Sequence, residues 1–152
     1  MISKYEVFST VISSLYHAIQ SIERNEMAKY GLKGPHAQCL TVMNRYPDGI
    51  TAAQLCDLCE RDKAAISRTV AELEEAGLLY RKEQNGIRYR VPLVLTQAGV
   101  QAADHVTEVA QRAVEQAGAG LNDQQREIFY HVLGVIAKNL YSIRENGLAE
   151  KR

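Results

Sequence analysis

The sequence predicts a mainly α-helical fold with one small β-hairpin. Along most of the chain, apolar residues recur every three or four positions, which is the period of an amphipathic helix. The stretch from Leu78 to Thr96 is different, because it is rich in Leu, Val, Ile and Tyr and is divided by Asn85-Gly86. Asn-Gly between two such runs is the strongest short-range signal for a hairpin. No repeat or low-complexity linker interrupts the pattern, so we expect a single domain over residues 1–152.

Long helices are predicted on both sides of the centre of the chain. Residues 4–30 carry an apolar stripe with charged residues between its members. A helix over about 97–118 begins behind the cap Thr96, and a last helix begins behind the capping-box sequence Asn122-Asp-Gln-Gln125. The apolar stripes of these helices would leave a large exposed patch on a monomer. We therefore expect a homodimer in which the outer segments pair with those of a second copy.

Two short helices follow one another near the centre with almost no linker. Thr51-Ala52-Ala53-Gln54 is a capping-box sequence that begins the first helix. Asp62 is suited to cap the second helix, from Lys63 to Ala76, and Gly77 is a typical stop signal behind it. Two helices at a sharp turn, followed by a hairpin, predict a winged helix-turn-helix over residues 35–96. In this organisation residues 1–34 and 97–152 are the dimerisation helices.

The second short helix has a small and basic exposed face. Its predicted buried stripe consists of Ile66, Val70 and Leu73, with Thr69 beside them. The opposite face holds Ala64, Ser67, Arg68 and Ala71. Small side chains beside a serine and an arginine suit a helix that approaches base edges closely. Lys63 lies at the N-terminal end, where free backbone N–H groups and the helix dipole already favour phosphate.

The hairpin is the second basic element. It carries four basic side chains, Arg81, Lys82, Arg88 and Arg90. A strand period of two places Arg88 and Arg90 on one face. With Glu83 as the one acidic residue, residues 81–90 have a net charge of +3, although the whole chain has 18 basic and 18 acidic residues. A basic two-stranded tip has the shape and charge to lie along a minor groove or its phosphates.

The centre of the chain resembles the multiple-antibiotic-resistance-regulator (MarR) family. The resemblance rests on Asp62 followed by Ser67-Arg68-Thr69-Val70, Leu73-Glu74 and Gly77, and on Leu95-Thr96-Gln-Ala-Gly99 after the wing; the flanking helices match as well. It implies a homodimeric, mostly bacterial repressor of palindromic operators. Wings of this family usually carry Asp ahead of an Arg near the tip, whereas this tip is Asn85-Gly86-Ile87. The resemblance therefore gives the minor-groove role to Arg88, with Arg90 next.

Together, the residues and the resemblance predict the partners of the protein. Double-stranded DNA with a pseudo-palindromic operator is expected, contacted by Lys63, Ala64, Ser67, Arg68, Arg81, Arg88 and Arg90. Many family members respond to small aromatic or lipophilic effectors, and some respond to oxidants or metals. The resemblance implies an effector cavity between the outer helices and the DNA-binding unit. Its candidate residues are Tyr16, His36 and Cys39, which could instead be core or interface residues.

Other functions receive less support from the sequence. Cys56 and Cys59 share the core side of their helix with Leu55, which favours packing, and Cys39 stands alone on the helix predicted from Pro35 to about Arg45. The four histidines include no pair at metal-ligand spacing, so neither a metal nor a cofactor is expected. No nucleophile set, phosphate loop or carboxylate pair predicts an enzyme. A thiol- or metal-responsive regulator of the same fold, and a protein-interaction module without DNA binding, are the alternatives.

The sequence also predicts a cytoplasmic chain. No apolar run reaches the length of a membrane span, and residues 1–14 lack the continuous apolar stretch of a signal peptide. An odd number of cysteines, three, fits a reducing compartment better than a disulfide framework.

Overall fold

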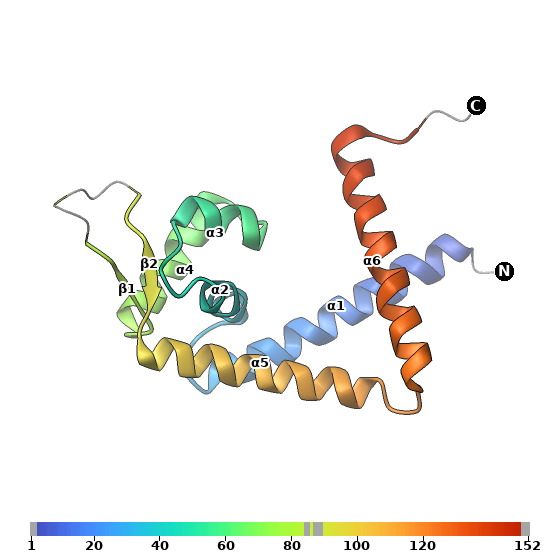
Figure 1. Ribbon diagram of the computed structural model, residues 1–152, viewed down its shortest axis with the longest axis horizontal. Helices are drawn as coiled ribbons and strands as arrows, with labels where there is room; N and C mark the ends of the chain where they lie inside the picture. Colours follow the sequence, from blue (N-terminus) through green and yellow to red (C-terminus); the bar gives the residue numbers. More distant parts are fainter. Residues whose placement is uncertain (1–2, 84–85, 87–89, 150–152) are drawn as a thin grey trace. The chain divides into compact units, whose positions relative to one another are not determined.

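The computed structural model describes residues 3–83, 86 and 90–149. In this part of the chain six α-helices and one two-stranded antiparallel sheet are present (Figure 1). The chain divides into two compact units, residues 1–112 and residues 113–152. The mainly helical fold with a small wing is therefore confirmed, whereas the assignment of one domain to the whole chain stays a prediction.

The first unit contains four complete helices, the sheet and most of a fifth helix. The helices are α1 (Lys4–Ala28), α2 (Gly34–Asn44), α3 (Ala52–Cys59), α4 (Lys63–Glu75) and α5 (Gln97–Ala117), and the strands are β1 (Leu79–Arg81) and β2 (Leu93–Leu95). The predicted caps are confirmed. Thr51 Oγ1 accepts a hydrogen bond from the Gln54 backbone at 3.3 Å, Asp62 Oδ1 from Ala65 at 2.8 Å, and the Thr96 hydroxyl caps α5.

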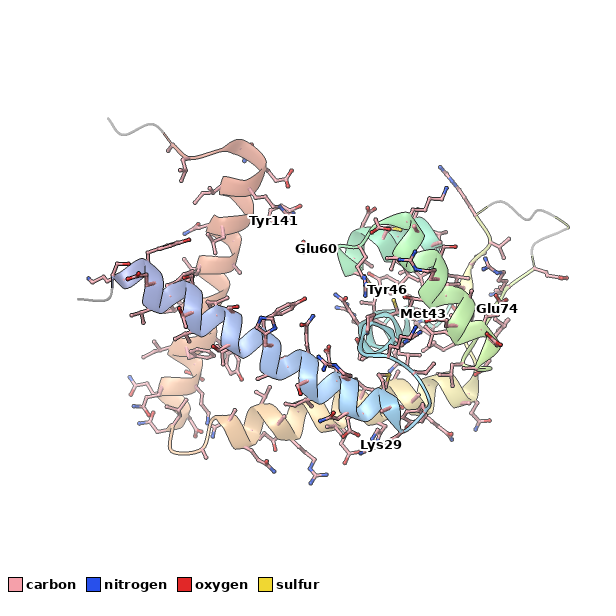
Figure 2. The ribbon with its side chains drawn as sticks, turned by 180° about the vertical axis from the view of Figure 1, so that it is seen from behind. Lys29, Met43, Tyr46, Glu60, Glu74 and Tyr141 are labelled. Carbon is pink, nitrogen blue, oxygen red and sulfur yellow. The ribbon has the colours of Figure 1, made fainter. Side chains whose placement is uncertain are left out.

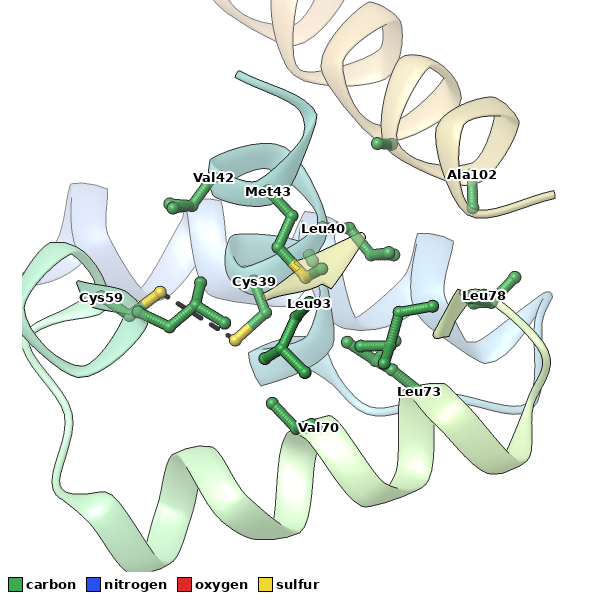
Figure 3. Close-up of a cluster of buried hydrophobic side chains, with 14 of the residues drawn as sticks. Cys39, Leu40, Val42, Met43, Cys59, Val70, Leu73, Leu78, Leu93 and Ala102 are labelled. Carbon is green, nitrogen blue, oxygen red and sulfur yellow. Dashed lines mark hydrogen bonds between the residues drawn. The ribbon is translucent and has the colours of Figure 1, made fainter. Parts of the chain in front are cut away.

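The core of this unit lies between α2, α3, α4, the sheet and the start of α5 (Figure 3). Its largest buried side chains include Leu40, Met43, Ile50, Leu55, Ile66, Leu73 and Leu93. On α1, Met27 is the buried residue, so this helix meets the core near its C-terminal end. α3 and α4 both pack on α2, which holds the two helices of the helix-turn-helix together.

The wing differs from the hairpin that the sequence predicts. Its strands are only three residues long, and Arg81 pairs with Leu93. A two-residue Asn-Gly turn would instead pair Arg81 with residue 90. Arg90 has a φ of 55°, which is a left-handed and not a strand conformation, so the expected strand alternation does not extend to it. Asn85 and Arg88 lie outside the described residues.

The register of the wing is set by contacts on the other side of β2. Leu93 donates a backbone hydrogen bond to Ile50 at 2.8 Å and accepts one from Ile50 at 3.0 Å. Pro92 precedes the strand, where its missing N–H is not needed, and its carbonyl accepts from Lys82. Gly49 lies against Pro92 so closely that an added Cβ would come within 2.7 Å of the Pro92 Cβ. The segment before α3 therefore holds β2 in place.

The second unit consists of the end of α5, a turn and α6 (Asp123–Asn146). The capping box of Asn122 and Gln125 is confirmed, with both hydrogen bonds at 2.9 Å. The Arg126 guanidinium donates to the carbonyls of Gly118 and Leu121 and so closes the turn. α6 has no buried residue in the structure, although much of its surface is apolar.

In the described part of the chain, no helix combines the length and the hydropathy that a membrane crossing requires.

Candidate nucleic-acid interface

Helix α4 presents a continuous face of small and basic side chains. Lys63, Ala64, Ser67, Arg68 and Ala71 are all exposed, as the helical wheel predicts. The opposite side is in the core, where the buried residues are Ala65, Ile66, Thr69, Val70 and Leu73. The exposed face has no branched or aromatic side chain to keep a partner surface at a distance. A partner surface can therefore approach the backbone of α4 closely along this face.

The N-terminus of α4 is fixed by its cap. The hydrogen bond from the Ala65 backbone holds the pKa of the Asp62 carboxyl below its ordinary value, with smaller contributions from Arg68 and Arg61. Lys63 is the first residue of the helix, so its charge adds to the positive end of the helix dipole. This end of α4 attracts anions even though its cap is an acid.

The acidic C-terminal half of α4 joins the helix to its neighbours. Glu72 Oε2 lies 2.7 Å from His36 Nε2, and its Oε1 lies 3.4 Å from Lys33 Nζ, both on the segment that begins α2. Partial desolvation raises the pKa of Glu72, but hydrogen bonds from Lys33 and His36 lower it overall. The helix dipole disfavours an acidic residue near the C-terminal end of a helix, and these contacts offset that cost for Glu72.

Arg81 is tied to the same helix. Its Nε lies 3.3 Å from Glu74 Oε2, and Glu74 is at the C-terminal end of α4 (Figure 2). Both side chains are about half exposed, so the pair contributes little to stability. It does direct the Arg81 side chain toward α4 at the base of the wing. Arg90 is exposed, and Arg88 lies outside the described residues.

A cationic cavity of about 150 Å³ adjoins this face. It is lined by Lys33, Pro35, His36, Arg61, Ala65, Arg68, Thr69 and Glu72. Sequence reasoning missed Lys33, which is the N-cap residue of α2, and Arg61, which precedes Asp62, the N-cap residue of α4. That position, next to two helix N-termini, is the signal that could have identified them as candidate site residues.

The three candidate effector residues do not meet at this cavity. His36 lines it and is only 2% exposed, but Tyr16 and Cys39 are not among its lining residues. Tyr16 is exposed on α1, and Cys39 is completely buried in the core. Their assignment to an effector site therefore stays a prediction.

Two cysteines that are distant in sequence lie close together in the core. The Sγ atom of Cys39 lies 3.9 Å from Cys59 Sγ (Figure 3). The sequence did not indicate this contact, because these residues are 20 positions apart and only the packing of α2 on α3 brings them together. Cys59 is buried as predicted, and Cys56 is partly exposed. Among the described residues, no group of three His, Cys, Asp or Glu could hold a metal ion.

The central helices and the first wing strand lie in a segment that matches a known sequence family. Residues 30–86, which run from the end of α1 through the first wing strand, match the sequence model of the MarR family. This segment is similar in sequence to the MarR family. A comparison with curated protein sequences found no match.

Solved MarR structures share the fold of nearly the whole chain. A MarR transcriptional regulator from Methanosarcina mazei Go1 has a TM-score of 0.80 at 23% identity, covering 91% of this chain and 99% of its own. A MarR-family regulator from Listeria monocytogenes, complexed with a 26mer DNA, has a TM-score of 0.77 at 18% identity, and the match covers 93% of this chain and 97% of the Listeria chain. Staphylococcus aureus MepR in complex with DNA has a TM-score of 0.75 at 16% identity, and the match covers 87% of this chain and 97% of MepR. The fold is that of MarR transcription regulators.

Proposed function

We propose that the protein is a sequence-specific DNA-binding transcription regulator that inserts α4 into the major groove. The observation that carries the proposal is the exposed face of α4, where Lys63, Ser67 and Arg68 stand among alanines. Glu72 and Glu74 contact neighbouring elements at the far end of the helix, away from this basic face. The similarity to two solved MarR-family structures that contain DNA supports the same reading.

Each basic residue has a distinct role in this proposal. Ser67 and Arg68 contact base edges, and Ala64 allows the close approach that such contacts need. Lys63 contacts phosphate at the helix N-terminus, and we add Lys33 and Arg61 to the phosphate-contacting set because they line the adjacent cationic cavity. The wing residues Arg81, Arg88 and Arg90 are assigned to the minor groove or its phosphates.

The proposed active form is a homodimer. The apolar side chains of α6 and of the N-terminal half of α1 are exposed in the single chain, with Leu140 50%, Phe129 47% and Leu15 50% accessible. A soluble monomer rarely exposes so many large apolar side chains on one helix. A second copy would cover them, and two α4 helices would then read a pseudo-palindromic operator.

We propose further that the protein represses its targets and is released by a small aromatic or lipophilic effector. An effector can regulate DNA binding only if it binds more tightly to the dimer at one spacing of the two α4 helices than at another. Tyr16, His36 and Cys39 remain the candidate contacts. His36 has the most support, because it lines a cavity beside α4 and contacts Glu72 of that helix.

Selection of duplexes from a random DNA pool tests the proposal and yields the operator. Arg68→Ala should then weaken operator binding about tenfold or more and relax base preference at one position. Arg112→Ala, which removes an exposed arginine from α5, is the matched control and should leave binding unchanged. Equal affinity of wild type and Arg68→Ala at fixed salt would refute the α4 assignment, and failure to select any sequence would favour the protein-interaction module.

A further inference from the structure

The beginning of α2 is joined to the side of α4 through one buried histidine. His36, in the first turn of α2, is only 2% exposed, and its Nε2 lies 2.7 Å from Glu72 Oε2 on α4. An ionised carboxylate can only accept a hydrogen bond, so Nε2 carries a proton and faces Glu72. On the other side of the ring, the Lys33 backbone N–H donates to Nδ1 at 2.9 Å. The ring therefore connects the N-terminus of α2 to α4.

We propose that His36 and Glu72 are positioning residues for DNA reading, because their contact fixes the rotation of α4 about its own axis. This inference rests on the proposed function of α4 as the helix that enters the major groove. Neither residue belongs to the exposed face of α4 that is assigned to the bases. They act through Arg68, which lies one helical turn before Glu72 and lines the same cavity.

A small rotation of α4 is enough to lose a base contact. The side-chain surface of an α-helix lies about 5–6 Å from the helix axis, so a rotation of about 20° moves that surface by about 2 Å. A hydrogen bond tolerates only a few tenths of an ångström around its preferred length. A helix that reads bases therefore needs a contact off its reading face that opposes such a rotation. Phosphate contacts are less demanding, because their attraction is mainly electrostatic and needs no exact geometry.

The side-chain contacts that hold the C-terminal half of α4 differ in strength. Glu74 and Arg81 are each about half exposed and lie 3.3 Å apart, so water screens their attraction. Lys33 Nζ lies 3.4 Å from Glu72 Oε1, and the lysine side chain is 76% exposed. His36 is buried and closer to Glu72, and its planar ring has a direction that the Lys33 backbone holds. The His36–Glu72 contact is therefore the one that constrains the rotation of α4 most.

Glu72 is the carboxylate that is placed to accept from His36. The cavity beside the ring is lined by three cationic side chains, Lys33, Arg61 and Arg68, and Glu72 is the one acid among the described residues that line it. Without an acceptor at position 72, the Nε2 proton would face cationic surroundings. A buried polar group without a partner is costly, so we expect the ring and α4 to shift until the proton finds another acceptor.

Two substitutions at position 72 separate the acceptor from the charge. Glu72→Gln and Glu72→Met both delete one negative charge and have similar length and helix propensity, but only glutamine offers His36 a strong acceptor. A difference between these two variants therefore measures the loss of the acceptor. Glu75→Met, at an exposed position of the same helix, is the matched control for the methionine.

The readout is the ratio of the affinities for two fluorescent duplexes. One is the operator that wild type selects from a random pool, and the other is a scrambled duplex of the same length. Glu72→Met should lower this ratio about tenfold through weaker operator binding, without weakening the scrambled duplex, which is held by phosphate contacts. Glu72→Gln and Glu75→Met should stay within about twofold of wild type. A lower unfolding midpoint in urea with an unchanged ratio would mean a merely structural contact and would overturn the proposal.

The remaining measurements check folding and the contact itself. Circular dichroism tests whether each variant folds, and Glu72→Ala takes the place of Glu72→Met if that variant does not. Nitrogen-15 NMR of the DNA-free protein, with His36 assigned from His36→Gln, should show a proton on Nε2, and a ring protonated on Nδ1 alone would contradict the contact. If wild type selects no duplex, the proposed function and the positioning role both fail. A selected operator with an unchanged ratio in Glu72→Met refutes the positioning role alone.

Discussion

At the scale of single residues, Gly99 determines how α5 leaves the wing. A Cβ at this position would lie 1.9 Å from the carbonyl oxygen of Leu78, a separation that real Cβ atoms do not show. The Thr96 hydroxyl donates to the Gly77 carbonyl at 2.7 Å and accepts from the Gly99 backbone at 3.1 Å. Glycine is needed here for space, because the start of the helix packs directly on backbone.

We expect Gly99→Ala to destabilise the protein by about 1–3 kcal/mol, since overpacking against fixed backbone forces the helix to shift. Gly34→Ala is the matched control, because the nearest neighbour of its added Cβ, the Arg24 Cβ, would lie at an ordinary 3.6 Å. Urea denaturation of both variants measures the difference. Equal midpoints for the two variants would show that α5 can move away from Leu78 at little cost.

At the scale of elements, local chemistry explains what the sequence could predict. Thr51, Asp62 and Asn122 each cap a helix through a backbone N–H three residues away, so a short sequence contains both partners. The wing register depends instead on Ile50, far from β2 in sequence, and the strands came out shorter than predicted. The Cys39–Cys59 contact and the cationic cavity likewise depend on tertiary packing, which the spacing of apolar residues along the sequence does not predict.

The contact between α1 and α5 gives a pH-dependent prediction. Glu26 Oε2 lies 2.6 Å from Lys29 Nζ and 2.8 Å from His105 Nε2, and these hydrogen bonds, Lys29 first, lower the pKa of Glu26 below 4.5. A lowered folded-state pKa stabilises the fold above the unfolded-state value, and this stabilisation is lost as the pH falls through the folded value. Glu26 should therefore stabilise the protein at neutral pH and cease to do so in acid.

Denaturation of wild type and Glu26→Gln from neutral pH to well below 4.5 checks this expectation. Wild type should be the more stable of the two at neutral pH, and the difference should shrink toward zero in acid. Glu108→Gln removes an exposed carboxylate from the same helix, α5, that carries His105 and serves as the control. A difference that stays constant with pH would mean that the Glu26 charge is not what stabilises the contact.

At the scale of the whole molecule, the net charge is zero because 18 basic and 18 acidic residues cancel, but these residues are not evenly distributed. Residues 81–90 carry +3, and in the cationic cavity Lys33, Arg61 and Arg68 outnumber the acid Glu72. Long-range attraction to DNA is therefore weak, and binding by the proposed interface relies on a few placed cations. The affinity of such an interface for DNA should rise strongly when two copies bind one operator, because the second copy doubles the number of contacts with DNA.

The proposed dimer makes the last prediction. Leu140 of α6 is 50% exposed in the single chain and belongs to the apolar stripe of that helix. Leu140→Glu places a charge where a second copy would bury a leucine, so the variant should sediment as a monomer and bind a selected palindromic duplex about tenfold more weakly or worse. Lys138→Glu introduces the same acid on the same helix without removing an apolar contact, and it should remain dimeric. Sedimentation of wild type as a monomer, or of Leu140→Glu as a dimer, would show that α6 does not form the interface.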